Sequence, residues 1–140
     1  MADWTRYFAG KRVWVTGASS GIGEALVKAL GAAGVSTLAS ARRVDRLEAL
    51  AASHESVSVL PLDLADRSGT QETVARAWDQ LGGIDVLINN AGITQRARFV
   101  ESDPAALERV IDVDLLGTMR LTHAVAARMN HQGSGHLVVI

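Results

Sequence analysis

The sequence predicts an α/β fold in which a parallel sheet carries helices on both faces. Short β-branched segments alternate along the 140 residues with longer Ala- and Leu-rich segments, a pattern typical of strand–helix–strand units with right-handed crossovers. Residues 84–88 are nearly continuously apolar, as expected of a strand buried on both faces. Apolar residues make up 48% and charged residues 21% of the chain, which is the composition of a folded globular domain.

Five short segments rich in β-branched residues are the predicted strands. In chain order they are residues 12–16, 35–41, 56–60, 84–88 and 136–140. Pro61 directly follows the third segment. It ends that strand because proline has no N–H with which to continue a hydrogen-bonded ladder.

Four longer segments are the predicted helices, and they cover residues 21–33, 44–53, 67–81 and 104–130. The first of them places apolar residues on one stripe at helical spacing, namely Ile22, Ala25, Leu26, Ala29 and Leu30. Gly34 then supplies a helix stop. Before the longest helix, Asp103 is a good N-cap and Pro104 fits the first helical position.

Charge, hydropathy and cysteine content exclude several classes of protein. With 14 Lys and Arg against 15 Asp and Glu, the net charge is −1, which argues against a nucleic-acid partner. No apolar run reaches the roughly 18 residues of a membrane span, and residues 1–11 lack the apolar core of a secretory signal. We therefore expect a cytoplasmic protein without a membrane partner. The chain has no cysteine, and His123 and His131 have no second pair of ligands, so we expect no metal site.

A glycine-rich turn joins the first predicted strand to the first predicted helix. Residues 16–23 read Thr-Gly-Ala-Ser-Ser-Gly-Ile-Gly. Gly17 permits the tight turn, Gly21 lets the backbone approach a pyrophosphate, and Gly23 lets the helix pack closely. Ser19 and Ser20 add hydroxyl donors, Ile22 lies inside the turn, and the helix N-terminus adds free N–H groups. The alternative is an ordinary strand–helix turn without a ligand.

This turn predicts the order of the strands. In a dinucleotide-binding Rossmann-type sheet the order is 3-2-1-4-5-6. We therefore expect the order 3-2-1-4-5 here, with helices on both faces. Residues 1–140 form a single NAD(P)-binding domain in this hypothesis, truncated after the fifth strand and incomplete at its C-terminal end.

The end of the second predicted strand indicates which nucleotide is bound. An acidic residue about 20 positions beyond the glycine turn holds the ribose hydroxyls in NAD-binding proteins. Here that place is taken by Ala41, followed by Arg42 and Arg43. Arginine binds phosphate through two parallel hydrogen bonds, so we expect NADP(H) to be favoured over NAD(H). The alternative is that both arginines are solvated residues at the start of a helix.

Four motifs together resemble the short-chain dehydrogenase/reductase family in its compact, single-domain branch. They are residues 16–23, Asp63-Leu64, residues 89–92 (Asn-Asn-Ala-Gly) and residues 110–117 (Val-Ile-Asp-Val-Asp-Leu-Leu-Gly). More narrowly, residues 40–43 and 89–96 resemble the branch called dehydrogenase/reductase member 7-like.

The resemblance implies a role for several residues and a reaction for the family. Arg42 is implied as the main contact of the 2′-phosphate, Asp63 as an acceptor for the adenine amino group and Leu64 as a wall of the adenine slot. Asn90, Ala91 and Gly92 are implied beside the nicotinamide ribose. The implied reaction is hydride transfer between NADP(H) and an alcohol or carbonyl substrate.

The catalytic residues of that family are mostly without a counterpart in this sequence. The family uses a Ser, a Tyr-x-x-x-Lys motif and an Asn in the long helix. The single tyrosine, Tyr7, precedes the first strand, and Asp114 stands at the Asn position. Helical spacing places Asp114 on an apolar stripe with Ile111 and Leu121, where a buried carboxylate is costly unless it is hydrogen-bonded. Asp114 either replaces the Asn or serves only a structural role.

Two further expectations concern the whole chain. The leading hypothesis is that the chain is the cofactor-binding part of an oxidoreductase. The alternative is a catalytically silent dinucleotide-binding or interaction module that ends at Ile140. The long helix 104–130 is apolar on more than one side, so we expect one side to pack on the sheet and another to form a homo-oligomer.

Overall fold

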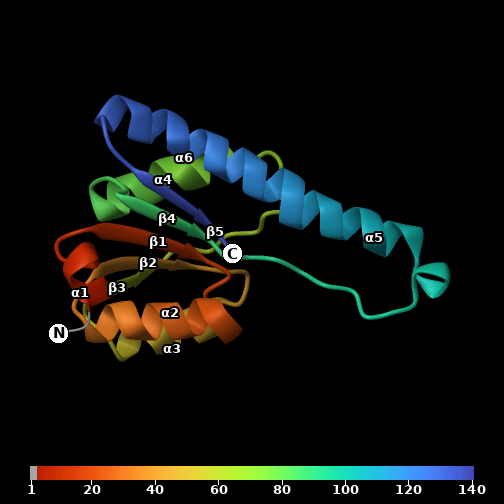
Figure 1. Cartoon of the computed structure of the whole chain (residues 1–140), viewed down its shortest axis with the longest axis horizontal. Coiled ribbons are helices and arrows are strands. Elements are labelled where there is room, and N and C mark those ends of the chain that lie inside the picture. The colour runs from red at the N-terminus through yellow and green to blue at the C-terminus, as the bar shows by residue number, and fades with distance from the viewer. Residues whose placement is uncertain (1–2) are drawn as a thin grey trace.

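The computed structural model describes residues 3–140 and contains one five-stranded sheet (Figure 1). Its strands are β1 (Arg12–Thr16), β2 (Ser36–Ser40), β3 (Val57–Val59), β4 (Val86–Asn89) and β5 (His136–Val139). They run parallel in the order β3-β2-β1-β4-β5. The predicted strand order is confirmed, and β1 lies at the centre, where Trp14 pairs with Leu38 of β2 and Leu87 of β4.

Helices cover both faces of the sheet. They are α1 (Asp3–Phe8), α2 (Gly21–Ala32), α3 (Val44–Ala52), α4 (Thr70–Leu81), α5 (Pro104–Val110) and α6 (Thr118–Gln132), with a short 3-10 turn η1 (Phe99–Glu101). Figure 1 shows α2 and α3 on one face and α4 and α6 on the other, while α5 and η1 extend beyond the sheet. This layered α/β arrangement is the predicted fold class.

Alternate residues of the central strands fill two separate cores. Val13 and Val15 face α2 and α3, where they pack with residues such as Val27 and Leu47. Trp14 faces the other side and packs with the apolar residues of α4 and α6. Its buried indole N–H donates to Ser40 Oγ at 2.8 Å, so the largest core side chain has its polar group satisfied.

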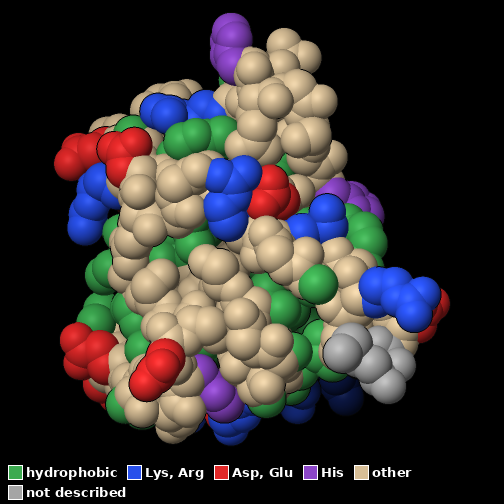
Figure 2. All heavy atoms as spheres, turned by 90° about the vertical axis from the view of Figure 1, so that its left-hand side faces the viewer, with side chains coloured by type: hydrophobic (Ala, Val, Ile, Leu, Met, Phe, Trp, Pro, Cys, Tyr) green, Lys and Arg blue, Asp and Glu red, His purple; other side chains and the backbone are tan. Residues whose placement is uncertain are grey.

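The short helix α1 was not expected from the sequence. It has six residues, too few to show a helical repeat, and tertiary contacts stabilise it instead. A hydrogen bond of 2.6 Å joins Tyr7 Oη to His136 Nδ1 at the start of β5, and Phe8 packs against the α2–α3 core. Tyr7 therefore lies at the amino end of the sheet. On this end, Figure 2 shows acidic and basic side chains interspersed.

The start of α4 also differs from the prediction, because the helix begins at Thr70 and not at Arg67. Asp66 Oδ1 accepts hydrogen bonds from the N–H groups of Ser68 and Gly69, at 3.0 and 3.2 Å. These bonds, together with the Ser68 hydroxyl, hold the pKa of Asp66 below its ordinary value. The side chain thus fixes a turn in front of the helix.

The predicted long helix forms without a break from Pro104 to Gln132, but it is not α-helical throughout. Asp103 caps it by accepting from Ala105 N at 3.0 Å, with Pro104 in the first position, as the sequence indicates. Residues Ile111–Gly117 then form a π-helical segment between α5 and α6. The expectation of a regular helix over 104–130 is wrong there, because single-sequence periodicity does not report the contacts that widen the turn. Among the described residues, no helix is long and apolar enough to cross a membrane.

Candidate functional site

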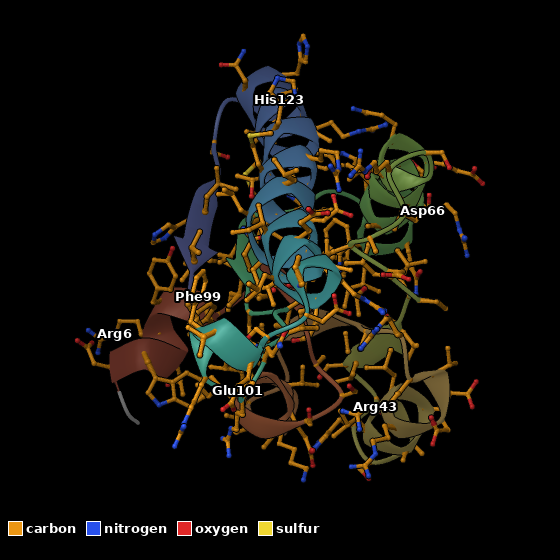
Figure 3. The ribbon with its side chains drawn as sticks, turned by 90° about the vertical axis from the view of Figure 1, so that its right-hand side faces the viewer. Arg6, Arg43, Asp66, Phe99, Glu101 and His123 are labelled. Carbon is orange, nitrogen blue, oxygen red and sulfur yellow. The ribbon has the colours of Figure 1, made fainter. Side chains whose placement is uncertain are left out.

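A cavity of about 340 Å³ opens at the carboxyl ends of β1, β2 and β4. Most of the residues singled out in the sequence line it, namely Gly17, Ser19, Ser20, Ile22, Arg42, Arg43, Asp63, Leu64, Asn90, Ala91 and Gly92. Ala41 and Ile93 also line it. Figure 3 looks at this end of the molecule, with Arg43 beside α3 on one side and Phe99 and Glu101 of η1 on the other. The crevice outside the carboxyl ends of parallel strands is where open α/β sheets bind ligands.

Each of the three glycines of the turn is favoured at its position for a different structural reason. Gly17 has a φ of +67°, and a Cβ there would lie 2.7 Å from the Cα of Ala91. A Cβ on Gly23 would overlap the carbonyl oxygen of Gly17. Gly21 has open space around it and a φ of +57°, so its backbone conformation already favours glycine, and its closeness to a pyrophosphate stays a prediction. Gly21 and Gly23 therefore shape the turn without lining the cavity.

The end of β4 is locked onto the glycine turn by Asn90 and Thr16. Asn90 Nδ2 donates to the carbonyl oxygens of Thr16 and Gly17, both at 3.2 Å. Thr16 Oγ1 accepts from the N–H groups of Asn90 and Ala91, both at 3.1 Å. Sequence reasoning did not assign Thr16 a role at the site. The sequence feature that could have identified Thr16 is a polar residue at the last position of a buried strand, directly before Gly17.

Arg43 is hydrogen-bonded across the glycine turn. Its Nη2 donates to Ser20 Oγ at 2.9 Å and to Ser19 Oγ at 3.1 Å, and its Nε donates to Ser19 Oγ at 3.3 Å. Arg42 lines both this cavity and a neighbouring one of about 340 Å³, in which Asp63 and Asp66 also lie. Arg42 and Arg43 therefore both line the cavity, next to the buried Ala41.

Asp63 and Leu64 lie in the loop between β3 and α4. Asp63 Oδ1 accepts from Ala65 N at 3.0 Å, and so Asp63 fixes its own loop and does not cap α4. Leu64 is buried and packs in the core under α4 and α6. Both residues line the cavity, as do Gly92 and Ile93.

Asp114 lies in the π-helical segment and is exposed. Its placement on a buried stripe is therefore wrong, and Ile111 of the same stripe is exposed as well. Its Oδ1 accepts from Ile93 N at 2.8 Å, which anchors the loop after β4 to the helix. A structural, hydrogen-bonded role is thus visible for Asp114, while its catalytic role stays a prediction.

The remaining candidates lie away from the cavity. Tyr7 is at the other end of the sheet, beside His136. Among residues 3–140, no group of three or more His, Asp or Glu side chains is arranged to hold a metal ion.

The fold and this cavity define the class of dinucleotide-binding α/β domains. The model of the short chain dehydrogenase family matches residues 11–140. The chain belongs to that family.

Three known proteins illustrate the similarity. The human dehydrogenase/reductase SDR family member 7 is 37% identical over 136 residues, which cover 91% of this chain and 40% of that protein. A short-chain dehydrogenase from Streptomyces avermitilis has a TM-score of 0.85 at 35% identity, covering 99% of this chain and 50% of that one. An alcohol dehydrogenase from Thermococcus sibiricus, solved with 5-hydroxy-NADP, has a TM-score of 0.83 at 33% identity, covering 91% and 57%. The chain thus spans about half the length, or less, of these relatives.

Proposed function

We propose that residues 1–140 are the NADP-binding part of an oxidoreductase that interconverts an alcohol and a carbonyl compound. The observation that carries the proposal is the pair Arg42 and Arg43 at the edge of the cavity, next to Ala41 instead of an acid. Guanidinium groups favour a 2′-phosphate, and the Thermococcus sibiricus relative was solved with an NADP derivative.

The residues present fit the proposed cofactor. No side chain caps the N-terminus of α2 at Ser20, so its first N–H groups are available to a pyrophosphate. The spaces that a Cβ on Gly17 or Gly23 would fill are occupied by backbone and by Asn90, which keeps the turn flat against the end of β4. Asp63 lies within reach of an adenine ring bound against Leu64.

Within this proposal each group of residues has one task. The glycine turn and α2 hold the pyrophosphate, Arg42 and Arg43 hold the 2′-phosphate, and Asn90 with Thr16 fixes the wall beside the ribose. The bound nicotinamide supplies or accepts the hydride. Asp114 keeps the loop at Ile93 in place through its hydrogen bond of 2.8 Å.

Binding and turnover are separable in this chain, because its single tyrosine lies on α1 and the sequence contains no Tyr-x-x-x-Lys motif. Calorimetric titration of the purified 140-residue chain should show NADPH binding more tightly than NADH. The same chain should not oxidise NADPH in the presence of a carbonyl compound. Equal binding of both nucleotides, or no binding, would contradict the NADP proposal. Rapid carbonyl-dependent oxidation of NADPH by this chain would contradict the expectation that hydride transfer needs the Tyr-x-x-x-Lys motif, which the sequence does not contain.

The long helix supports a second, independent part of the proposal, which is self-association. Ile111, Leu115 and Met119 have exposed fractions of 53%, 57% and 56%. They follow one another at a spacing of four residues and form an outward apolar stripe. A second copy of the chain is the partner we propose for this stripe, in a homo-oligomer.

A further inference from the structure

The loop that carries Asp63 and Leu64 is tied to the long helix at the carbonyl group of Leu64. Arg120 Nη2 donates to that oxygen at 3.3 Å. Beside it, a Cβ on Gly117 would lie 2.6 Å from the same oxygen and 2.8 Å from the Cβ of Leu64. The helix therefore touches the Leu64 backbone directly, and only a glycine at 117 leaves room for this contact.

A carboxylate holds the arginine that makes this contact. Asp112 Oδ1 lies 3.6 Å from Arg120 Nη2 and 2.9 Å from Arg67 Nη2. The side chains of Asp112 and Arg120 are only 24% and 23% exposed, whereas that of Arg67 is 68% exposed. Asp112 Oδ1 accepts a hydrogen bond from Arg67 and lies at ion-pair distance from Arg120. Its charge therefore attracts the partly buried Arg120 guanidinium without a hydrogen bond to it.

The π-helical segment is what brings these groups to one side of the helix. Asp112 and Arg120 are eight positions apart, and a regular α-helix would place them about 80° out of line. A π-helix closes its hydrogen bonds from i to i+5 and so turns less per residue. The segment Ile111–Gly117 removes most of that offset, which allows Asp112, Gly117 and Arg120 to face the same loop.

We propose that Arg120, held by Asp112, is a positioning residue for the adenine side of the nucleotide cavity. The inference rests on the nucleotide site proposed above. Arg120 does not line the cavity, whereas Leu64 and Asp63 do, so Arg120 acts through the backbone of Leu64. The π-helical segment also holds Ile93, another residue that lines the cavity, through Asp114, so the long helix positions two parts of the lining.

The test measures affinity for the adenine end alone. Adenosine 2′,5′-bisphosphate is titrated by calorimetry into the wild-type protein, Arg120→Met and Arg128→Met. Arg128 is the matched control, because it lies on the same helix with its guanidinium 5.8 Å from the ring centroid of Trp78, away from the cavity. Because Arg120 contacts the wall and not the ligand, Arg120→Met should raise the Kd by about 3- to 10-fold, less than the loss of a direct charge-assisted hydrogen bond. Arg128→Met should bind like the wild type.

Two further variants separate positioning from general stability. Arg120→Lys retains a donor and a positive charge and should recover most of the affinity. Asp112→Asn should raise the Kd in the same direction as Arg120→Met, and the two changes combined should be less than additive. If Arg120→Met does not fold, the result for Asp112→Asn decides.

The outcomes that overturn the inference are distinct from those that overturn the proposed function. If the wild type binds and both Arg120→Met and Asp112→Asn bind equally well, Arg120 has no positioning role and the nucleotide site stands. If Arg128→Met loses as much affinity as Arg120→Met, the effect is on the whole helix and the inference is overturned. If the wild type binds neither adenosine 2′,5′-bisphosphate nor NADPH, the proposed function fails and the inference fails with it.

Discussion

Asn90 donates two hydrogen bonds to Thr16 across the ends of β1 and β4, one from its main chain and one from its side chain. The hydroxyl of Thr16 accepts from the Asn90 main-chain N–H at 3.1 Å, and the Asn90 side chain donates to the Thr16 carbonyl at 3.2 Å. Residues far apart in the chain thus form one rigid corner under the glycine turn.

Replacing Thr16 by Val should weaken both the fold and the site. The change keeps the shape but leaves the N–H groups of Asn90 and Ala91 without their acceptor, which costs about 1–3 kcal/mol. Chemical denaturation should show this loss, and NADPH titration should show a higher Kd. Thr37→Val is the control, because Thr37 is equally buried but donates to Val35 O away from the cavity. An unchanged NADPH affinity in Thr16→Val would contradict the role of this corner.

Two glycines of the turn should respond differently to alanine. Gly23→Ala places a methyl group against the Gly17 carbonyl, so we expect loss of NADPH binding and of stability. Gly21→Ala meets no atom within 4 Å and should cost only about 1–2 kcal/mol for the left-handed conformation. Gly10→Ala is the control, since its φ is +72° with open space and it lies outside the cavity. Equal NADPH affinity in Gly23→Ala and Gly10→Ala would refute this assignment.

The two arginines at the cavity edge should select the cofactor. Arg42→Ala removes a charge-assisted bond and should weaken NADPH by about 10- to 150-fold, with little effect on NADH. Adding Ala41→Asp to that change should reverse the preference, because a carboxylate accepts from ribose hydroxyls and repels a phosphate. Arg46→Ala is the control, because Arg46 lies on α3 and lines a different cavity. Parallel losses for NADPH and NADH in Arg42→Ala, measured by calorimetry, would make Arg42 structural.

Stability should fall in acid through Asp85. Its pKa is held below the ordinary 3.8 mainly by the Arg12 hydrogen bond, which outweighs the effect of burial. Asp85 accepts from Arg12 N, Nε and Nη2 at 2.8–2.9 Å. Because the folded-state pKa is the lower one, this stabilisation is complete above about pH 4 and is lost as the pH falls through the folded-state value. Asp85→Asn should lower the unfolding free energy at pH 7 and flatten its slope below pH 4. An unaltered slope in denaturation curves would argue against this pair.

The apolar stripe on the long helix should control association. Leu115→Lys places a charge in the middle of the stripe and should convert an oligomer into a monomer in light scattering. Phe99→Lys is the control, since Phe99 is 80% exposed on η1 and lies outside the stripe. A wild-type chain that stays monomeric at high concentration would contradict the proposed interface.

Features governed by local pattern were predictable from the sequence. The alternation of elements and the glycine turn were enough to predict the strand order, and the pair Asp103 and Pro104 was enough to predict the cap of the long helix. Features set by contacts between distant residues were missed. Gly117, the last residue of the π-helical segment, meets Leu64 of a distant loop, and Tyr7 of α1 reaches His136 at the start of β5. Neither contact leaves a periodic signal, and for the same reason Thr16 and Arg120 were not recognised.

The central place of β1 has a consequence for the order in which the chain folds. Val13 pairs with Thr37 on one side and with Val86 on the other, so one edge of β1 finds its partner early and the other only after a long intervening segment. Such distant pairing slows folding, and the ribosome releases the N-terminal part first. A nascent chain of β1, β2 and β3 therefore carries an unpaired apolar edge open to other chains. That edge closes when β4 is released, and the corner between Thr16 and Asn90 closes with it.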